Sequence, residues 1–173
     1  SDVLVNGITR SAFTFEKTAE MGATDAYMRY RGCFINAMTL SMAERTPIKI
    51  GFEILGMGVD DGDTAIITGA TYAAANANEV MPTGTHMGAI TMSGISAMPA
   101  VKSLDLRIES NLREQGQVGS NDLAGVALGK FRVSGTIGLY FDSVEVYNAC
   151  RDHDDANLQV TLGSVTGEKY TLL

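Results

Sequence analysis

The sequence predicts a mainly β fold, a sandwich or partly closed barrel with one packed α-helix. The hydrophobic pattern repeats every two residues over four segments, which is typical of half-buried strands. Helical periodicity is confined to two short segments. The chain has 173 residues, enough for one domain with its own core, so we expect a single domain over residues 1–173.

The four alternating segments cover residues 37–42, 48–54, 103–109 and 131–141. Successive side chains of a strand point to opposite faces, so each segment is predicted to have one apolar and one polar face. The apolar positions are Met38, Leu40, Met42, Ile48, Ile50, Phe52, Ile54, Leu104, Leu106, Ile108, Phe131, Val133, Ile137, Leu139 and Phe141. The chain thus contains the same kind of strand pair twice.

The first pair is predicted to form a hairpin, because turn residues 43–46 lead into Pro47, which suits the start of a strand. Shorter strands are expected at 12–17, 27–31, 89–92, 157–162 and 169–172.

Two segments are candidate helices. Residues 121–128 are flanked by polar capping residues and Gly129, and residues 143–152 begin at Ser143 with Glu145 in the first turn. Val146, Tyr147 and Cys150 form an apolar stripe on the second segment, which favours a helix packed on the sheet.

Residues 57–88 differ in composition from the rest of the chain. They are rich in Gly, Ala, Asn and Thr, contain four acidic residues and lack Lys and Arg. Segments of this length without regular structure are uncommon in compact domains. We interpret the segment as an arm that becomes ordered against a neighbouring subunit; the alternative is a tolerated surface insertion.

The charge balance argues against a nucleic-acid-binding surface. Thirteen Lys and Arg stand against 20 Asp and Glu, a formal net charge of −7, whereas nucleic-acid-binding surfaces are basic. The two cysteines, Cys33 and Cys150, match no metal-ligand spacing and are expected to be reduced. No apolar run approaches the roughly 20 residues that a membrane helix needs.

No residue pattern indicates catalysis or metal binding. Residues 152–155 (DHDD) are of types that can bind a metal, but consecutive residues rarely converge on one ion. We interpret them as a solvated helix end. Residues 60–63 (DDGD) lack the spaced ligands of a calcium loop. His86 has no evident acid or nucleophile partner. We therefore expect no cofactor, no metal and no enzymatic activity.

Several blocks resemble, in order, the tail tube proteins of long-tailed bacteriophages. They are FTFEK (13–17), YMRYRG (27–32), INAMTLSM (35–42), IKIGFEILG (48–56), SLDLRIESNLREQGQVGS (103–120) and GKFRVSGTIGLYF (129–141). The resemblance extends from about Phe13 to the end of the chain.

This resemblance implies a structural virion protein. Such proteins form rings, usually of six subunits or six equivalent domains. The rings stack into a tube around the tape-measure protein and later conduct DNA during ejection. Four strands of each domain join a ring-wide barrel and face its lumen. The lumen-facing candidates here are Thr39, Ser41, Lys49, Glu53, Ser103, Asp105, Arg107, Glu109, Arg132, Ser134 and Thr136.

The arm is implied to reach the neighbouring ring, with Asp60, Asp61, Asp63, Tyr72 and Glu79 as candidate contacts. Expected partners are further copies of the chain, the tape-measure protein, the tail terminator and the distal tail proteins, with transient passage of DNA and no membrane. The expected location is the virion tail, assembled in the bacterial host cytoplasm.

Two other readings of the sequence stay open. One is a related tube protein of a contractile secretion apparatus, and the other is a β-sandwich binding module. Members of the family are often longer, and this chain begins with Ser1. Either an initiator methionine has been removed, or the chain is the C-terminal part of a longer protein.

Overall fold

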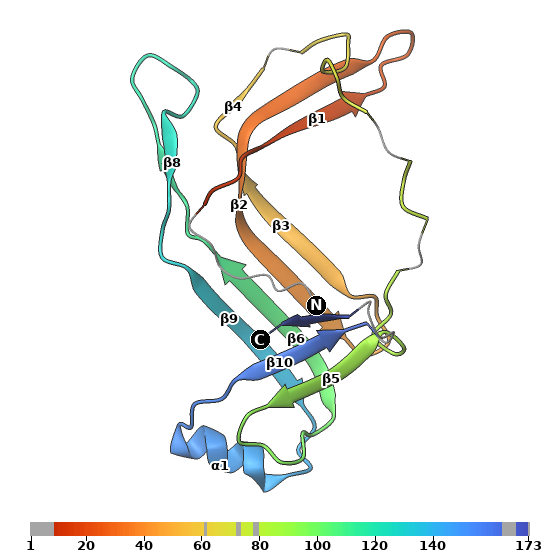
Figure 1. Ribbon diagram of the computed structural model, residues 1–173, viewed down its shortest axis with the longest axis vertical. Helices are drawn as coiled ribbons and strands as arrows, with labels where there is room; N and C mark the ends of the chain where they lie inside the picture. Colours follow the sequence, from red (N-terminus) through yellow and green to blue (C-terminus); the bar gives the residue numbers. More distant parts are fainter. Residues whose placement is uncertain (1–8, 61, 72–73, 78–79, 164–168, 173) are drawn as a thin grey trace.

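The computed structural model describes residues 9–60, 62–71, 74–77, 80–163 and 169–172 (Figure 1). The described strands are β1 (Phe13–Ala19), β2 (Ala26–Ala43), β3 (Lys49–Leu55), β4 (Gly58–Val59), β5 (Met87–Met92), β6 (Val101–Glu109), β7 (Arg113–Gln115), β8 (Gly125–Ala127), β9 (Arg132–Leu139), β10 (Leu158–Leu162) and β11 (Tyr170–Leu172). The described helix is α1 (Val144–Asp152). The mainly β prediction is confirmed, and the described strands form open antiparallel sheets, not a closed barrel.

The largest sheet brings the four alternating segments side by side. Its lower part has the order β3–β2–β6–β9, and every neighbouring pair is antiparallel. We call these four strands the main sheet. The predicted hairpin is β2–β3, with its turn between Ala43 and Lys49. The second predicted pair, β6 and β9, is also adjacent, although the β7–β8 hairpin lies between the two strands in the sequence.

Strand β2 is one continuous strand, which corrects the prediction of separate strands at 27–31 and 37–42. Its first half pairs with β1 and its second half with β3. Between the halves, one extra residue of β2 lies opposite β1, a β-bulge, and Gly32 has a φ of 57°. A Cβ on Gly32 would lie 2.9 Å from Met57 Sδ. Glycine therefore permits the bend that lifts the β1–β2 hairpin away from the main sheet (Figure 1).

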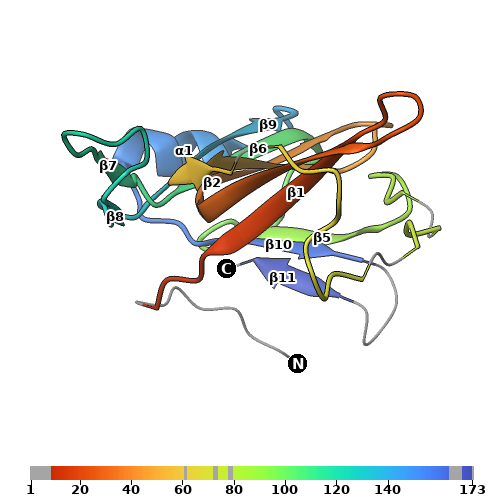
Figure 2. The same ribbon diagram turned by 90° about the horizontal axis from the view of Figure 1, so that it is seen from above.

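The core lies between the main sheet and a second sheet of order β11–β10–β5, which forms a separate layer (Figure 2). Leu40, Met42 and Leu104 from the main sheet meet Val160 and Leu162 from β10, and all five are buried. Leu40, Met42 and Leu104 occupy apolar positions that alternation predicted.

The second sheet covers only part of the apolar face. Side chains on the two outer strands of the main sheet stay half exposed: Ile50 by 54%, Phe52 by 56%, Ile54 by 44% and Val133 by 56%. The apolar face that alternation predicted is therefore buried only in the middle of the sheet.

Residues 121–128 do not form the predicted helix. They contain β8, which pairs with β7 in a hairpin that the sequence did not predict. The capping signal is real but local, because the Asp122 N–H donates to Ser120 Oγ at 3.0 Å in a turn. The backbone then continues into a strand because the Leu123 N–H donates to the distant Met57 carbonyl.

Helix α1 begins and ends as predicted. Ser143 is its N-cap and accepts a hydrogen bond from the Glu145 N–H, and His153 ends it in the left-handed conformation with a φ of 56°. None of its residues is buried, however. The helix is therefore positioned by its ends and by Glu145, whose carboxylate accepts bonds from the Ser96 N–H and hydroxyl.

Candidate functional site

The register of the main sheet places all the lumen-facing candidates on one face. Directly paired residues of an antiparallel sheet share a face, and the pairs link β3 through β2 and β6 to β9 in three rows. The rows are Lys49–Ser41–Asp105–Thr136, Gly51–Thr39–Arg107–Ser134 and Glu53–Ala37–Glu109–Arg132. Ser103 follows on the same face of β6. We call this surface the polar face; its role as a channel lining stays a prediction.

Arg107 is the centre of an ion-pair network on the polar face. Its Nη2 lies 2.8 Å from Glu53 Oε2 on β3, and its Nε lies 2.5 Å from Glu109 Oε1 on its own strand. The hydrogen bond from Arg107 holds the pKa of Glu53 below its ordinary value, with a smaller contribution from Asn36. Glu53 is therefore ionised at neutral pH, and its charge is neutralised locally by Arg107.

Asn36 contacts the polar face, although the sequence did not single it out. Its Nδ2 donates to Glu53 Oε1 at 2.7 Å, and its Oδ1 accepts from the Leu112 N–H at 2.9 Å. It is the extra residue in a β2 bulge between Ile35 and Ala37. It thus fixes Glu53 and the chain leaving β6 at one end of the polar face. The signal for it was present as the only asparagine of the INAMTLSM block.

The polar face is balanced in charge. Lys49, Arg107 and Arg132 are basic, and the acidic candidates are Glu53, Asp105 and Glu109. The other candidates are Ser and Thr, and Ser41 donates to Asp105 Oδ1 at 2.6 Å. The net charge of −7 for the whole chain therefore comes from residues outside this face.

Both edges of the main sheet are open. Among the described residues, β3 pairs with β2 alone and β9 pairs with β6 alone. Unpaired edges of regular strands are templates for pairing with another chain. Half-exposed apolar side chains adjoin both edges, notably Phe52 on β3 and Val133 on β9. At each of the two edge strands, β3 and β9, unpaired backbone groups and exposed apolar side chains therefore lie next to each other among the described residues.

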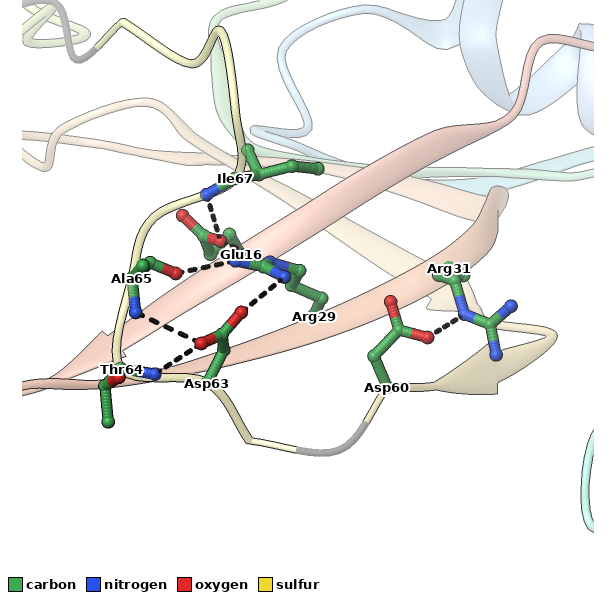
Figure 3. A network of polar contacts seen from close by, with 8 residues as sticks. All are labelled: Glu16, Arg29, Arg31, Asp60, Asp63, Thr64, Ala65 and Ile67. Atoms are coloured by element: carbon green, nitrogen blue, oxygen red, sulfur yellow. Dashed lines mark hydrogen bonds and ion pairs between the residues drawn. The ribbon is translucent and has the colours of Figure 1, made fainter.

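The first part of the arm is fastened to the β1–β2 hairpin (Figure 3). Arg29 donates to Glu16 Oε2 at 2.7 Å, to Asp63 Oδ2 at 3.3 Å and to the Ala65 carbonyl at 2.6 Å. Glu16 also accepts the Ile67 N–H at 3.0 Å. The Glu16 and Arg29 side chains are mostly buried, at 8% and 16% exposure. We call these contacts the arm clamp.

Asp60 and Asp63 therefore have partners within the subunit. Asp60 pairs with Arg31, which also reaches Asp122 at 3.1 Å, and Asp63 pairs with Arg29. Asp61, Tyr72 and Glu79 lie outside the described residues. The other end of the arm is attached too, since Pro82 bridges to Pro47 and the Ile48 N–H donates to the Met81 carbonyl at 2.9 Å.

The arm clamp is expected to weaken in acid. Hydrogen bonds from the Thr64 and Ala65 N–H groups hold the pKa of Asp63 below its ordinary value, and the charge of Arg29 adds to this. A depressed folded-state pKa contributes stability that is present above the unfolded pKa, about 4, and is lost as the pH falls through the folded value. Asp63→Asn should imitate the acid state at neutral pH and lower hydrogen-exchange protection of the Thr64 and Ala65 amides several-fold.

Asp155→Asn, an exposed carboxylate in the loop after α1, is the matched control and should leave those amides unchanged. Equal protection in Asp63→Asn and the unmodified protein would show that the clamp does not hold the arm.

Two antiparallel sheets in layers, the larger one open at both edges among the described residues, define a mainly β protein. A family model described as phage tail tube protein matches residues 2–173, so the chain belongs to the phage tail tube protein family. It is thus a structural component of the virion tail. No curated protein matches the sequence. Within the described residues, no helix has the length and apolarity to span a membrane.

Proposed function

We propose that the chain is a tail tube subunit that forms rings, that the rings stack around the tape-measure protein, and that the tube conducts DNA during ejection. The observation that carries the proposal is the main sheet, with a polar face, a partly uncovered apolar face and two free edges. Its role is structural and not enzymatic. Tail terminator and distal tail proteins cap the tube, which assembles in the host cytoplasm.

The strand directions suit ring closure. Strand β9 runs in the same direction as β2, because both are antiparallel to β6. Strand β3 runs opposite to β2 and therefore opposite to β9. When β9 of one copy lies beside β3 of the next, the sheet continues as an antiparallel sheet. Repetition around a closed ring leaves no free edge.

The side chains at the two edges also complement one another. Phe52 and Val133 lie on the apolar face, and an edge-to-edge contact brings apolar side chains of two copies together. On the polar face, β3 presents Glu53 and Lys49 while β9 presents Arg132. In a barrel with tilted strands, β9 of one copy is shifted along β3 of the next. The size of this shift decides which polar side chains of the two strands meet.

A lumen lined by the polar face suits passage of DNA without specific binding. Tight nucleic-acid binding requires an excess of Lys and Arg that neutralises phosphates. The polar face has no such excess, and Arg107 is already paired with Glu53 and Glu109. DNA therefore meets hydroxyl groups and a face on which three acidic residues balance three basic ones, so no excess positive charge holds the phosphate backbone.

The arm is proposed to contribute to stacking. The arm clamp at 63–67 and the attachment at Met81 and Pro82 hold its two ends against opposite parts of the subunit. Of the described residues between these ends, 68–71 and 74–77 run along one side of the molecule (Figure 1). They are thus placed to contact a copy in a neighbouring ring while the ends stay in position.

Negative-stain electron microscopy of the purified protein at high concentration, with light scattering for mass, tests the proposal. We expect rings or stacked tubes with a central hole. The control is the same protein with its edges blocked by substitution, as described in the Discussion. A protein that stays monomeric at high concentration, with and without the tape-measure protein, would contradict the proposed function.

A further inference from the structure

The turn of the β7–β8 hairpin presents an isolated apolar side chain to solvent. Val118 is fully exposed, at 106%. The turn is braced from its own base: Gln117 Nε2 donates to the Asp122 carbonyl at 3.4 Å, and the Asp122 N–H donates to Ser120 Oγ at 3.0 Å. Asp122 in turn pairs with Arg31 of β2 at 3.1 Å. An apolar side chain thus stands in water on a turn whose flanking residues are hydrogen-bonded to one another.

An apolar groove lies beneath α1. The cavity is about 660 Å³ and is open to solvent. Its apolar lining includes Met92, Ile95, Ile137, Leu139 and Val146, together with Cys150 of the helix. Because α1 has no buried residue, the groove is left unfilled by the helix that covers it.

The hairpin turn and the groove lie at opposite ends of the subunit and on the same side of it. Figure 1, with the longest axis vertical, shows the β7–β8 hairpin at the top left and α1 at the bottom left. Figure 2, which looks along that axis, shows the hairpin beside the helix at the same side. A second copy shifted along the long axis therefore brings its groove toward the turn of the first.

We propose that Val118 of one subunit inserts into the groove beneath α1 of a subunit in the adjacent ring, which rests on the proposed tube function. The contact is head-to-tail, so it repeats from ring to ring without closing. It covers an exposed apolar side chain and an unfilled apolar groove at once. Residues 115–121 contain no charged side chain, so the turn enters beside Asp154 at the groove without like-charge repulsion.

A cross-link tests the contact directly. Cys150 is exposed and lines the groove, whereas Cys33 is 2% exposed. In tubes of the Val118→Cys variant, a short bismaleimide is expected to join the introduced thiol of one subunit to the native Cys150 of another. Denaturing gels should then show a ladder that extends beyond the number of subunits in one ring. The controls are the unmodified protein and Val118→Cys combined with Cys150→Ser, neither of which should form the ladder.

The possible outcomes separate this contact from the proposed function. Tubes visible by microscopy but without cross-linking would overturn the contact and leave the tube intact. A ladder that stops at the size of one ring would place the contact inside the ring and also overturn it. If the unmodified protein forms neither rings nor tubes, the proposed function is wrong, and the contact, which requires stacked rings, is wrong too.

A second variant removes the apolar contact. Val118→Asp is expected to leave the thermal unfolding midpoint and ring formation unchanged, because the side chain touches solvent alone in the subunit. The association constant for stacking one ring on another should fall at least tenfold, since each weakened contact costs about 1.4 kcal/mol and two rings share several such contacts. The tubes should therefore be markedly shorter. Leu128→Asp, just past the base of the same hairpin and 47% exposed, is the matched control and should keep long tubes. Tubes of normal length in Val118→Asp would overturn the proposal.

Discussion

Replacing Leu104 with aspartate is expected to unfold the subunit. Leu104 is 1% exposed and belongs to the buried cluster that joins the main sheet to β10. The substitution removes apolar contacts and places a carboxylate where no partner is available. Such changes cost about 4 kcal/mol or more, against a total stability of about 5–15 kcal/mol for a domain. Urea denaturation followed by circular dichroism measures the loss.

Asp105→Ala is the matched control, one residue further along the same strand and on the opposite face. Asp105 is exposed, and its partner Ser41 is also on the surface, so the change should stay within about 1 kcal/mol. If Leu104→Asp unfolds at the same urea concentration as the unmodified protein, the assignment of faces to β6 is wrong.

Replacing Phe52 with aspartate is expected to abolish rings while the subunit stays folded. Phe52 is 56% exposed on the edge strand β3, so the isolated subunit loses little when it changes. In the proposed ring it adjoins β9 of the next copy, where burial of a phenylalanine side chain contributes about 1.5–3 kcal/mol. A loss of about 2.7 kcal/mol raises the dissociation constant of each contact about 100-fold.

Val133→Asp changes the opposite edge and should have the same effect, because the two edges meet in the ring. Mixing the two variants should give pairs but no closed rings: β9 of a Phe52→Asp copy meets β3 of a Val133→Asp copy through an unmodified interface, whereas the reverse interface contains two aspartates. Met21→Asp, 70% exposed between β1 and β2, is the control and should form normal rings. Light scattering measures the mass of the assemblies, and electron microscopy shows whether they are rings. Normal rings from Phe52→Asp would exclude the apolar side of β3 from the interface.

Local patterns in the sequence predicted most of the main sheet. Alternation at Met38–Met42 and Leu104–Ile108 gave the strands and the face of each side chain, because period-two alternation is a local property of a strand. Ser143 and the residues after it predicted α1 for the same reason, since capping acts within one turn. The lumen-facing candidates came from the family resemblance, and the register shows that they share one face.

The errors have a common physical cause. Residues 121–128 carry a true capping signal, yet they form β8 because the Leu123 N–H donates to the distant Met57 carbonyl and the Ala124 N–H donates to the Gln115 carbonyl of β7. The extension of β2 through Gly32 depends on β1 and β3 both being available as partners. In both cases the strand depends on hydrogen bonds to residues elsewhere in the sequence, so a local pattern cannot predict it.

Local patterns in the chain were enough to predict the β class, the two faces of the main strands, the position of α1 and, through the ordered blocks, the family. The tertiary structure was needed to establish that Glu16, Arg29 and Asp63 form one clamp and that Asn36 fixes Glu53. It also decided which apolar residues stay exposed. Strand phase follows from neighbouring residues, whereas these features depend on which strands lie side by side and on how much of one sheet the other can cover.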